Sequence, residues 1–138
     1  MLRSKPGINI NFDPETSLSF EGDSGPYLLY THARCFSLLE KAEIEKPLFD
    51  ESRDCSNLES TLLHFNVIFK ESIEDIAPQK LVTYLFKVAQ EFNSFYAQEQ
   101  IISENVKRTE HNLAIVSWTK EVIKQGLYVL GIEAVERM

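Results

Sequence analysis

Hydrophobic positions recur at helical spacing in four stretches of the chain, and this pattern predicts most of its secondary structure. In the clearest stretch, residues 78–98, apolar side chains follow one another at steps of four and three: Leu81, Leu85, Val88, Phe92 and Phe95. Such steps place apolar side chains on one face of an α-helix. The stretch opens with Pro78, whose missing N–H costs no hydrogen bond in a first turn. We therefore predict a helix over 78–98.

Two earlier helices are predicted from their start and stop signals. The first begins near Ser24, with Asp23 or Ser24 as its cap, and stops before Pro47. The second follows Ser56-x-x-Glu59, a capping box in which each side chain satisfies a free N–H of the first turn. Its apolar positions continue to the acidic stretch ESIED, where we expect it to end.

The last predicted helix runs from about Glu110 to Leu130. Gly131 follows it and suits the left-handed conformation that ends many helices. Gly126 lies inside it, where glycine costs roughly 1 kcal/mol relative to alanine. A residue this unfavourable indicates that another segment packs closely against the helix at Gly126.

These elements together predict an all-α fold, a helical bundle of four to six helices joined by short loops. Polar loops are expected at 44–55 and 99–109. Residues 1–22 contain only a brief apolar–polar alternation, around Ile8, Ile10 and Phe12, and we interpret them as an extended lead-in. The predicted domain is therefore 23–138.

Composition fits one water-soluble domain. The chain has 138 residues, 43% of them hydrophobic, which is enough for a core. No apolar run approaches the ~20 residues of a membrane span, and the segment MLRSKPGINI lacks the apolar stretch of a signal peptide. We expect a cytoplasmic location, in which Cys35 and Cys55 are reduced thiols.

The charge is strongly uneven along the chain. The net charge is −7, which by itself argues against nucleic acid as a partner. Residues 1–106 carry 9 basic and 17 acidic side chains, whereas residues 107–138 carry 5 basic and 4 acidic ones. Any contact with phosphate is therefore expected at the C-terminal end.

Local chemistry predicts no catalytic, cofactor or metal site. Neither GxxxxGK[ST] nor GxGxxG occurs, and His32 and Cys35 have no second pair to complete a metal site. Tyr96 is more informative because it lies just off the apolar stripe near a helix end. It either stacks on an unpaired base or is a half-buried side chain with a solvated hydroxyl, and the pattern leaves both open.

Three segments resemble the C-terminal anticodon-binding domain of arginyl-tRNA synthetases, in the same order. They are GDSGPYLLYTHAR at 22–34, APQKLVTYLFKVAQEFNSFY at 77–96 and LAIVSWTKEVIKQGLYVLGIEAVERM at 113–138. The resemblance implies an all-α bundle that binds the anticodon stem and loop of tRNA-Arg. It also implies a catalytic domain in cis, a monomer, and ATP and Mg²⁺ bound by that catalytic domain.

The class I signatures HIGH and KMSKS are absent from the sequence. We therefore expect that the chain does not make arginyl-tRNA by itself and that it corresponds to the last quarter or so of such an enzyme. The resemblance implies no cofactor, metal or catalytic residue within the chain.

The resemblance also implies a set of tRNA contacts. Tyr96 matches a tyrosine of the family's anticodon pocket, and Met138 matches a C-terminal methionine that turns toward the anticodon loop. Gln100 stands where some members have Trp, and Leu29 replaces a Gln. The remaining expected contacts are Asn105, Lys107 and Arg108 before the last helix, Lys120 and Lys124 on it, and Arg137 in the tail. His32 and Arg34 are expected to hold the bundle together.

Two other functions stay open at this point. Other class I synthetases carry a related helical anticodon-binding domain. A protein–protein interaction bundle without an RNA role is the alternative that the acidic composition favours.

Overall fold

The computed structural model describes residues 7, 9, 13–15, 24–42, 47–50 and 52–138. Within them it contains five helices and no strand, which confirms the predicted all-α class. The helices are α2 (Gly25–Ala42), α3 (Asn57–Leu63), α4 (Phe65–Glu74), α5 (Pro78–Gln98) and α6 (Val106–Val129).

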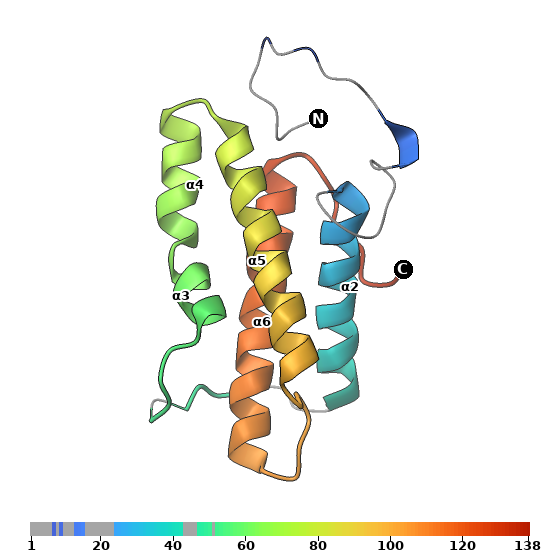
Figure 1. Ribbon diagram of the computed structural model, residues 1–138, viewed down its shortest axis with the longest axis vertical. Helices are drawn as coiled ribbons and strands as arrows, with labels where there is room; N and C mark the ends of the chain where they lie inside the picture. The colour runs from blue at the N-terminus through green and yellow to red at the C-terminus, as the bar shows by residue number, and fades with distance from the viewer. Residues whose placement is uncertain (1–6, 8, 10–12, 16–23, 43–46, 51) are drawn as a thin grey trace.

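The three long helices form the body of the bundle (Figure 1). Helix α2 packs most extensively on α6, and α5 contacts all four other helices. The short helices α3 and α4 flank α5 on the side away from α2 (Figure 1). Helices α2 and α5 both run from the upper end of the view to the lower end, whereas α6 runs upward. The core between them is made of fully buried apolar side chains, among them Leu85, Phe92, Leu113, Ile123 and Leu127.

The predicted starts of α2, α3 and α5 are confirmed. The Oγ of Ser24 accepts a hydrogen bond from the Tyr27 N–H at 3.2 Å, so Ser24 caps α2. At α3 both halves of the capping box are present: Ser56 Oγ accepts from Glu59 N, and Glu59 Oε2 accepts from Ser56 N. Pro78 is the first residue of α5. The alternative cap of α2, Asp23, lies outside the described residues.

Two glycines of the last helical segment behave as predicted. Gly131 has φ +76°, the left-handed conformation expected just after α6. At Gly126 an added Cβ would lie 2.6 Å from Leu85 Cδ2, so α5 and α6 approach more closely there than a side chain allows.

The predicted helix after Ser56 is in fact two helices. The chain breaks at His64, which ends α3 and precedes α4. The Tyr84 hydroxyl of α5 contacts two carbonyl groups at this break, those of Thr61 at 2.9 Å and Leu62 at 3.5 Å. This bond from another helix stabilises a break that the local sequence pattern does not reveal.

Helix α6 begins four residues earlier than predicted, at Val106 instead of about Glu110. Asn105 caps it, because its side-chain Oδ1 accepts from the Arg108 N–H at 3.1 Å. The loop expected over 99–109 therefore ends at Asn105.

The predicted lead-in, residues 1–22, lies mostly outside the described residues, and its extended form remains a prediction. None of the described helices combines the length and the apolar character that crossing a bilayer requires.

Candidate nucleic-acid interface

An arginine lies between two tyrosine rings where α2 and α5 meet. The Cζ of Arg34 is 4.7 Å from the centre of the Tyr30 ring and 4.8 Å from the centre of the Tyr96 ring. Tyr30 and Arg34 are four residues apart on α2, so they share a face, and Tyr96 comes from α5. We refer to these three residues as the Tyr30–Arg34–Tyr96 cluster.

Hydrogen bonds fix the guanidinium of this cluster. Arg34 donates from Nη1 to Asn93 Oδ1 at 2.7 Å and from Nη2 to the Tyr30 hydroxyl at 2.8 Å. Asn93 is held in turn, because its Nδ2 donates to the Tyr27 hydroxyl at 2.8 Å. The guanidinium is therefore pre-positioned before any ligand arrives.

The two rings remain accessible. Tyr30 is 38% exposed and Tyr96 is 40% exposed, while Phe92 packs beneath Tyr96 at 6.4 Å between ring centres. Tyr96 thus sits at the edge of the core with part of its ring open to solvent. Aromatic rings that are open in this way can stack on unpaired bases.

Sequence reasoning singled out Tyr96 but missed Tyr30 and gave Arg34 only a packing role. Arg34 does join α2 to α5, yet it also completes the accessible cluster. The signal that was available is the four-residue spacing of Tyr30 and Arg34 within the segment GPYLLYTHAR.

Four of the expected contact residues lie at the same end of the bundle as Tyr96. Arg108 of α6 pairs with Glu99 at the end of α5, which places the first turn of α6 beside the last turn of α5. Lys107 and Gln100 are exposed there. The Asn105 side chain is occupied by capping α6.

Lys120 and Lys124 lie elsewhere. At 1.5 Å per residue, Lys124 is about 25 Å along α6 from Lys107. Lys120 is half-buried and 3.8 Å from Glu121, and Lys124 lines a groove with Glu121, Glu133 and Glu136. The structure therefore does not gather the expected cations into one basic patch.

The C-terminal tail reaches α2 from a different side. His32 is buried, and its Nδ1–H donates to the Val135 carbonyl at 2.8 Å, while Arg137 pairs with Glu40 at 2.7 Å. Arg34 and Glu40 are six residues apart, so they point about 120° apart around α2. Tyr96 and Arg137 thus contact different flanks of α2, and Met138, the next residue after Arg137, is 59% exposed.

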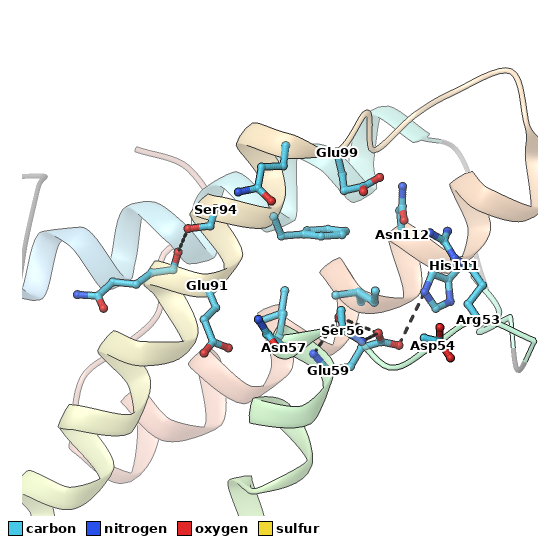
Figure 2. Close-up of a pocket in the computed structure, with 15 residues that line it drawn as sticks. Arg53, Asp54, Ser56, Asn57, Glu59, Glu91, Ser94, Glu99, His111 and Asn112 are labelled. Carbon is cyan, nitrogen blue, oxygen red and sulfur yellow. Dashed lines mark hydrogen bonds and ion pairs between the residues drawn. The ribbon is translucent and has the colours of Figure 1, made fainter.

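A second, polar groove of about 450 Å³ lies between α3, α5 and α6 (Figure 2). Figure 2 shows four carboxylates around it, those of Asp54, Glu59, Glu91 and Glu99. Such a groove repels phosphate, so it does not extend the nucleic-acid interface.

The histidine of this polar groove is held by the protein itself. His111 accepts from the Asp50 N–H at its Nδ1, at 3.1 Å, and its Nε2 is 3.8 Å from Glu59 Oε1. Glu59 in turn is engaged by Ser56 in the capping box. His111 and Glu59 therefore serve the packing of α3 on α6.

Both cysteines are free thiols, in agreement with the sequence prediction. Cys35 is fully buried and Cys55 is exposed. Burial raises the pKa of Cys35 well above its usual range. In the part of the chain that the structure describes, no three His, Cys, Asp or Glu side chains gather as metal ligands.

Comparison with known proteins places these features in a family context. An arginine–tRNA ligase of Thermococcus kodakarensis is 37% identical over 100% of this chain and 23% of its own length. Arginine–tRNA ligase 1 of Bacillus cereus is 38% identical over 99% of this chain and 25% of its own length. The chain thus spans about a quarter of the length of the curated relatives it matches.

A solved structure agrees in three dimensions. The arginyl-tRNA synthetase of Thermus thermophilus superposes with a TM-score of 0.89 at 32% sequence identity, over 99% of this chain and 25% of that one. The model of the DALR anticodon binding domain matches residues 28–138, which include every described helix except the start of α2. From its sequence and its fold, the chain belongs to the DALR anticodon-binding domain family of arginyl-tRNA synthetases.

Proposed function

We propose that the chain recognises the anticodon stem-loop of tRNA-Arg and that the Tyr30–Arg34–Tyr96 cluster receives its unpaired bases. The observation that carries this proposal is the guanidinium of Arg34 held between two part-exposed tyrosine rings. Stacking of a base on an aromatic ring contributes ~1–3 kcal/mol, and it requires bases that are unpaired, as in a loop. The family and its arginine–tRNA ligase relatives support the choice of RNA.

Phosphate contacts are proposed around this cluster. Lys107 and Arg108 lie at the same end of the bundle as Tyr96. Gln100 and Asn105 belong to the loop that joins α5 to α6 there. They fix the register of the RNA through its backbone, whereas the cluster contacts its bases. Lys120 and Lys124 are left out of the proposal because they lie far along α6, next to carboxylates.

The tail completes the proposed interface from the other flank of α2. Arg137 is exposed and pairs with Glu40 in the last turn of α2, and Met138, the next residue, is also exposed. An RNA loop that covers this end of the bundle would contact both flanks. Backbone groups of the tail are proposed to read base edges there.

The role of the chain in catalysis is proposed to be indirect. The relatives are about four times as long and are arginine–tRNA ligases, so the chain would position tRNA for a catalytic domain that lies outside it. That domain would bind ATP and Mg²⁺. A monomer in the cytoplasm is the arrangement proposed for the whole enzyme.

Filter binding with a tRNA-Arg transcript tests the proposal. We expect the logarithm of the association constant to fall linearly with the logarithm of the salt concentration. The reason is that phosphates release their counterions when basic side chains bind them. Tyr96→Ala should weaken binding about tenfold, whereas Tyr128→Ala, which removes an 80% exposed tyrosine distant from the cluster, should not. Binding that ignores salt, or equal affinities of the two variants, would overturn the proposal. Circular dichroism of both variants establishes that the bundle remains folded.

A further inference from the structure

An apolar groove lies on a different side of α2 from the Tyr30–Arg34–Tyr96 cluster, with His32 of α2 among its lining residues. It has a volume of about 1150 Å³ and runs between α4, the outer face of α6 and tail residues 131–136. Phe65 and Phe69 stack on each other at 5.9 Å on the α4 side. On the α6 side, Tyr128 is 80% exposed and Val129 is 48% exposed. We call this the α4–α6–tail groove.

One wall of the groove contains a buried acceptor without a partner. His32 donates from Nδ1 to the Val135 carbonyl, so a neutral ring keeps its lone pair on Nε2. His32 is only 2% exposed, and within the described part of the chain its Nε2 has no hydrogen-bond partner. A buried acceptor left unsatisfied is costly, and a donor group from a bound ligand would satisfy it.

The charges of the groove select for a cation. Glu121, Glu133 and Glu136 line it, against Lys124 as the single Lys or Arg among its lining residues, and Glu121 lies 3.8 Å from Lys120, so the two tail carboxylates contribute most of the negative charge. Glu133 and Glu136 lie within two residues of Val135, whose carbonyl accepts the hydrogen bond from His32. Two carboxylates therefore belong to the tail segment that contacts this histidine. A guanidinium group has only hydrogen-bond donors and is always positively charged. It can therefore donate to His32 Nε2 and pair with the carboxylates.

We propose that the α4–α6–tail groove docks a cationic amphipathic helix of another protein. The apolar face of that helix lies on Phe65, Phe69 and Tyr128, and an arginine side chain reaches toward the tail carboxylates and His32 Nε2. This is the helix-in-groove mode of recognition, with charge complementarity setting specificity.

The same charges disfavour other occupants. Phosphates of RNA would face the carboxylates of Glu133 and Glu136, and a second copy of a chain with net charge −7 would bring acidic surface against acidic surface. His32 and Arg34 are two residues apart, so they point about 160° apart around α2. The groove and the Tyr30–Arg34–Tyr96 cluster therefore face different sides of α2, and the peptide measurement does not require RNA binding.

Fluorescence anisotropy with a synthetic peptide tests the inference. The probe has about 18 residues, or five turns of helix, with leucines on one face and lysines and arginines elsewhere. Its control replaces every Lys and Arg by Glu. We expect saturable binding of the cationic peptide that weakens with salt, and binding of the acidic peptide that is at least about tenfold weaker.

Matched variants locate the binding on the protein. The double variant Glu133→Lys/Glu136→Lys should weaken binding about tenfold, whereas Glu74→Lys/Glu104→Lys, an equal charge change at exposed positions outside the groove, should weaken it far less. Tyr128→Ser should also weaken binding. His32→Asn retains a donor near the position of Nδ1 and removes Nε2, so we expect a loss of about fivefold for the arginine-containing peptide.

Several results would overturn the inference. Equal affinity for both peptides, or equal losses in the two charge-reversal variants, would show that the groove does not select a cation. Displacement of the peptide by tRNA-Arg would place RNA in the groove. Self-association in sedimentation that Tyr128→Ser abolishes would identify a second copy as the occupant. Thermal melts of each variant establish that it is folded, and the tRNA measurement on Tyr96→Ala, which lies outside the groove, fails or succeeds independently.

Discussion

Gly126 on α6 lies directly against the side chain of Leu85 on α5. A Cβ at position 126 would be 2.6 Å from Leu85 Cδ2 and 2.8 Å from Leu85 Cδ1. Leu85 is fully buried at the centre of the core, so its methyl groups have little room to move. The contact explains why a residue that weakens helices occurs in the middle of α6.

Gly126→Ala should destabilise the domain in spite of alanine's higher helix propensity. The propensity gain is about 1 kcal/mol, whereas overpacking a core typically costs about 1–3 kcal/mol. We expect a net loss of up to about 2 kcal/mol in the free energy of unfolding, measured by urea denaturation. In a Leu85→Val background the same substitution should cost less. A stabilising Gly126→Ala would show that Leu85 moves aside freely.

Ser56→Ala should lower stability through the loss of the α3 cap. The substitution removes the Oγ that accepts from Glu59 N and leaves the largely buried Glu59 carboxylate with one fewer donor. Loss of such a cap costs about 1–2 kcal/mol. Ser60→Ala, at an exposed position on the same helix, is the control and should change the midpoint of urea unfolding very little. Similar midpoints for the two variants would contradict the role given to the capping box.

Arg34→Lys should weaken RNA binding although it retains the positive charge. A lysine ammonium lacks the planar fork that donates to both Asn93 and Tyr30, and it stacks poorly on the two rings. We expect a loss of about 1–2 kcal/mol in binding free energy to tRNA-Arg, and a larger one for Arg34→Met. Filter binding at fixed salt measures both. A lysine variant that binds like the parent chain would mean that charge alone matters at this position.

One cysteine should react with a thiol reagent in the native protein and two in the unfolded one. Cys55 is exposed, whereas Cys35 is fully buried and its raised pKa keeps it as the unreactive thiol at pH 8. Colorimetric titration at pH 8, with and without denaturant, counts the reactive groups. In Cys55→Ser the fast-reacting group should disappear. Fast labelling of that variant would show that α2 opens readily.

The sequence predicted those helix boundaries whose signals are local. Pro78 at the start of α5, the Ser56–Glu59 capping box and the left-handed Gly131 each act on residues within one turn, and all three are confirmed. The close approach at Gly126 was also predicted, because an unfavourable residue inside a helix indicates a packing constraint.

Features that depend on distant residues were not predictable in this way. The break at His64 interrupts a continuous apolar pattern, and its carbonyl groups are satisfied by Tyr84, more than 20 residues away. The early start of α6 was missed for another reason, since the Asn105 capping signal was present but was assigned to a loop. At the candidate site, Tyr96 was found from its helix position, whereas its pairing with Arg34 depends on how α2 and α5 pack.

The contact between His32 and Val135 joins residues that are 103 positions apart in the chain. Helix α2 packs mainly on α6, so the earliest of the described long helices has its principal partner in the described helix that emerges after all the others. Contacts of such large sequence separation slow folding, because the chain loses the entropy of a long loop before it gains the contact. We therefore expect α2 through α5 to leave the ribosome loosely packed, and the domain to close only once α6 has emerged.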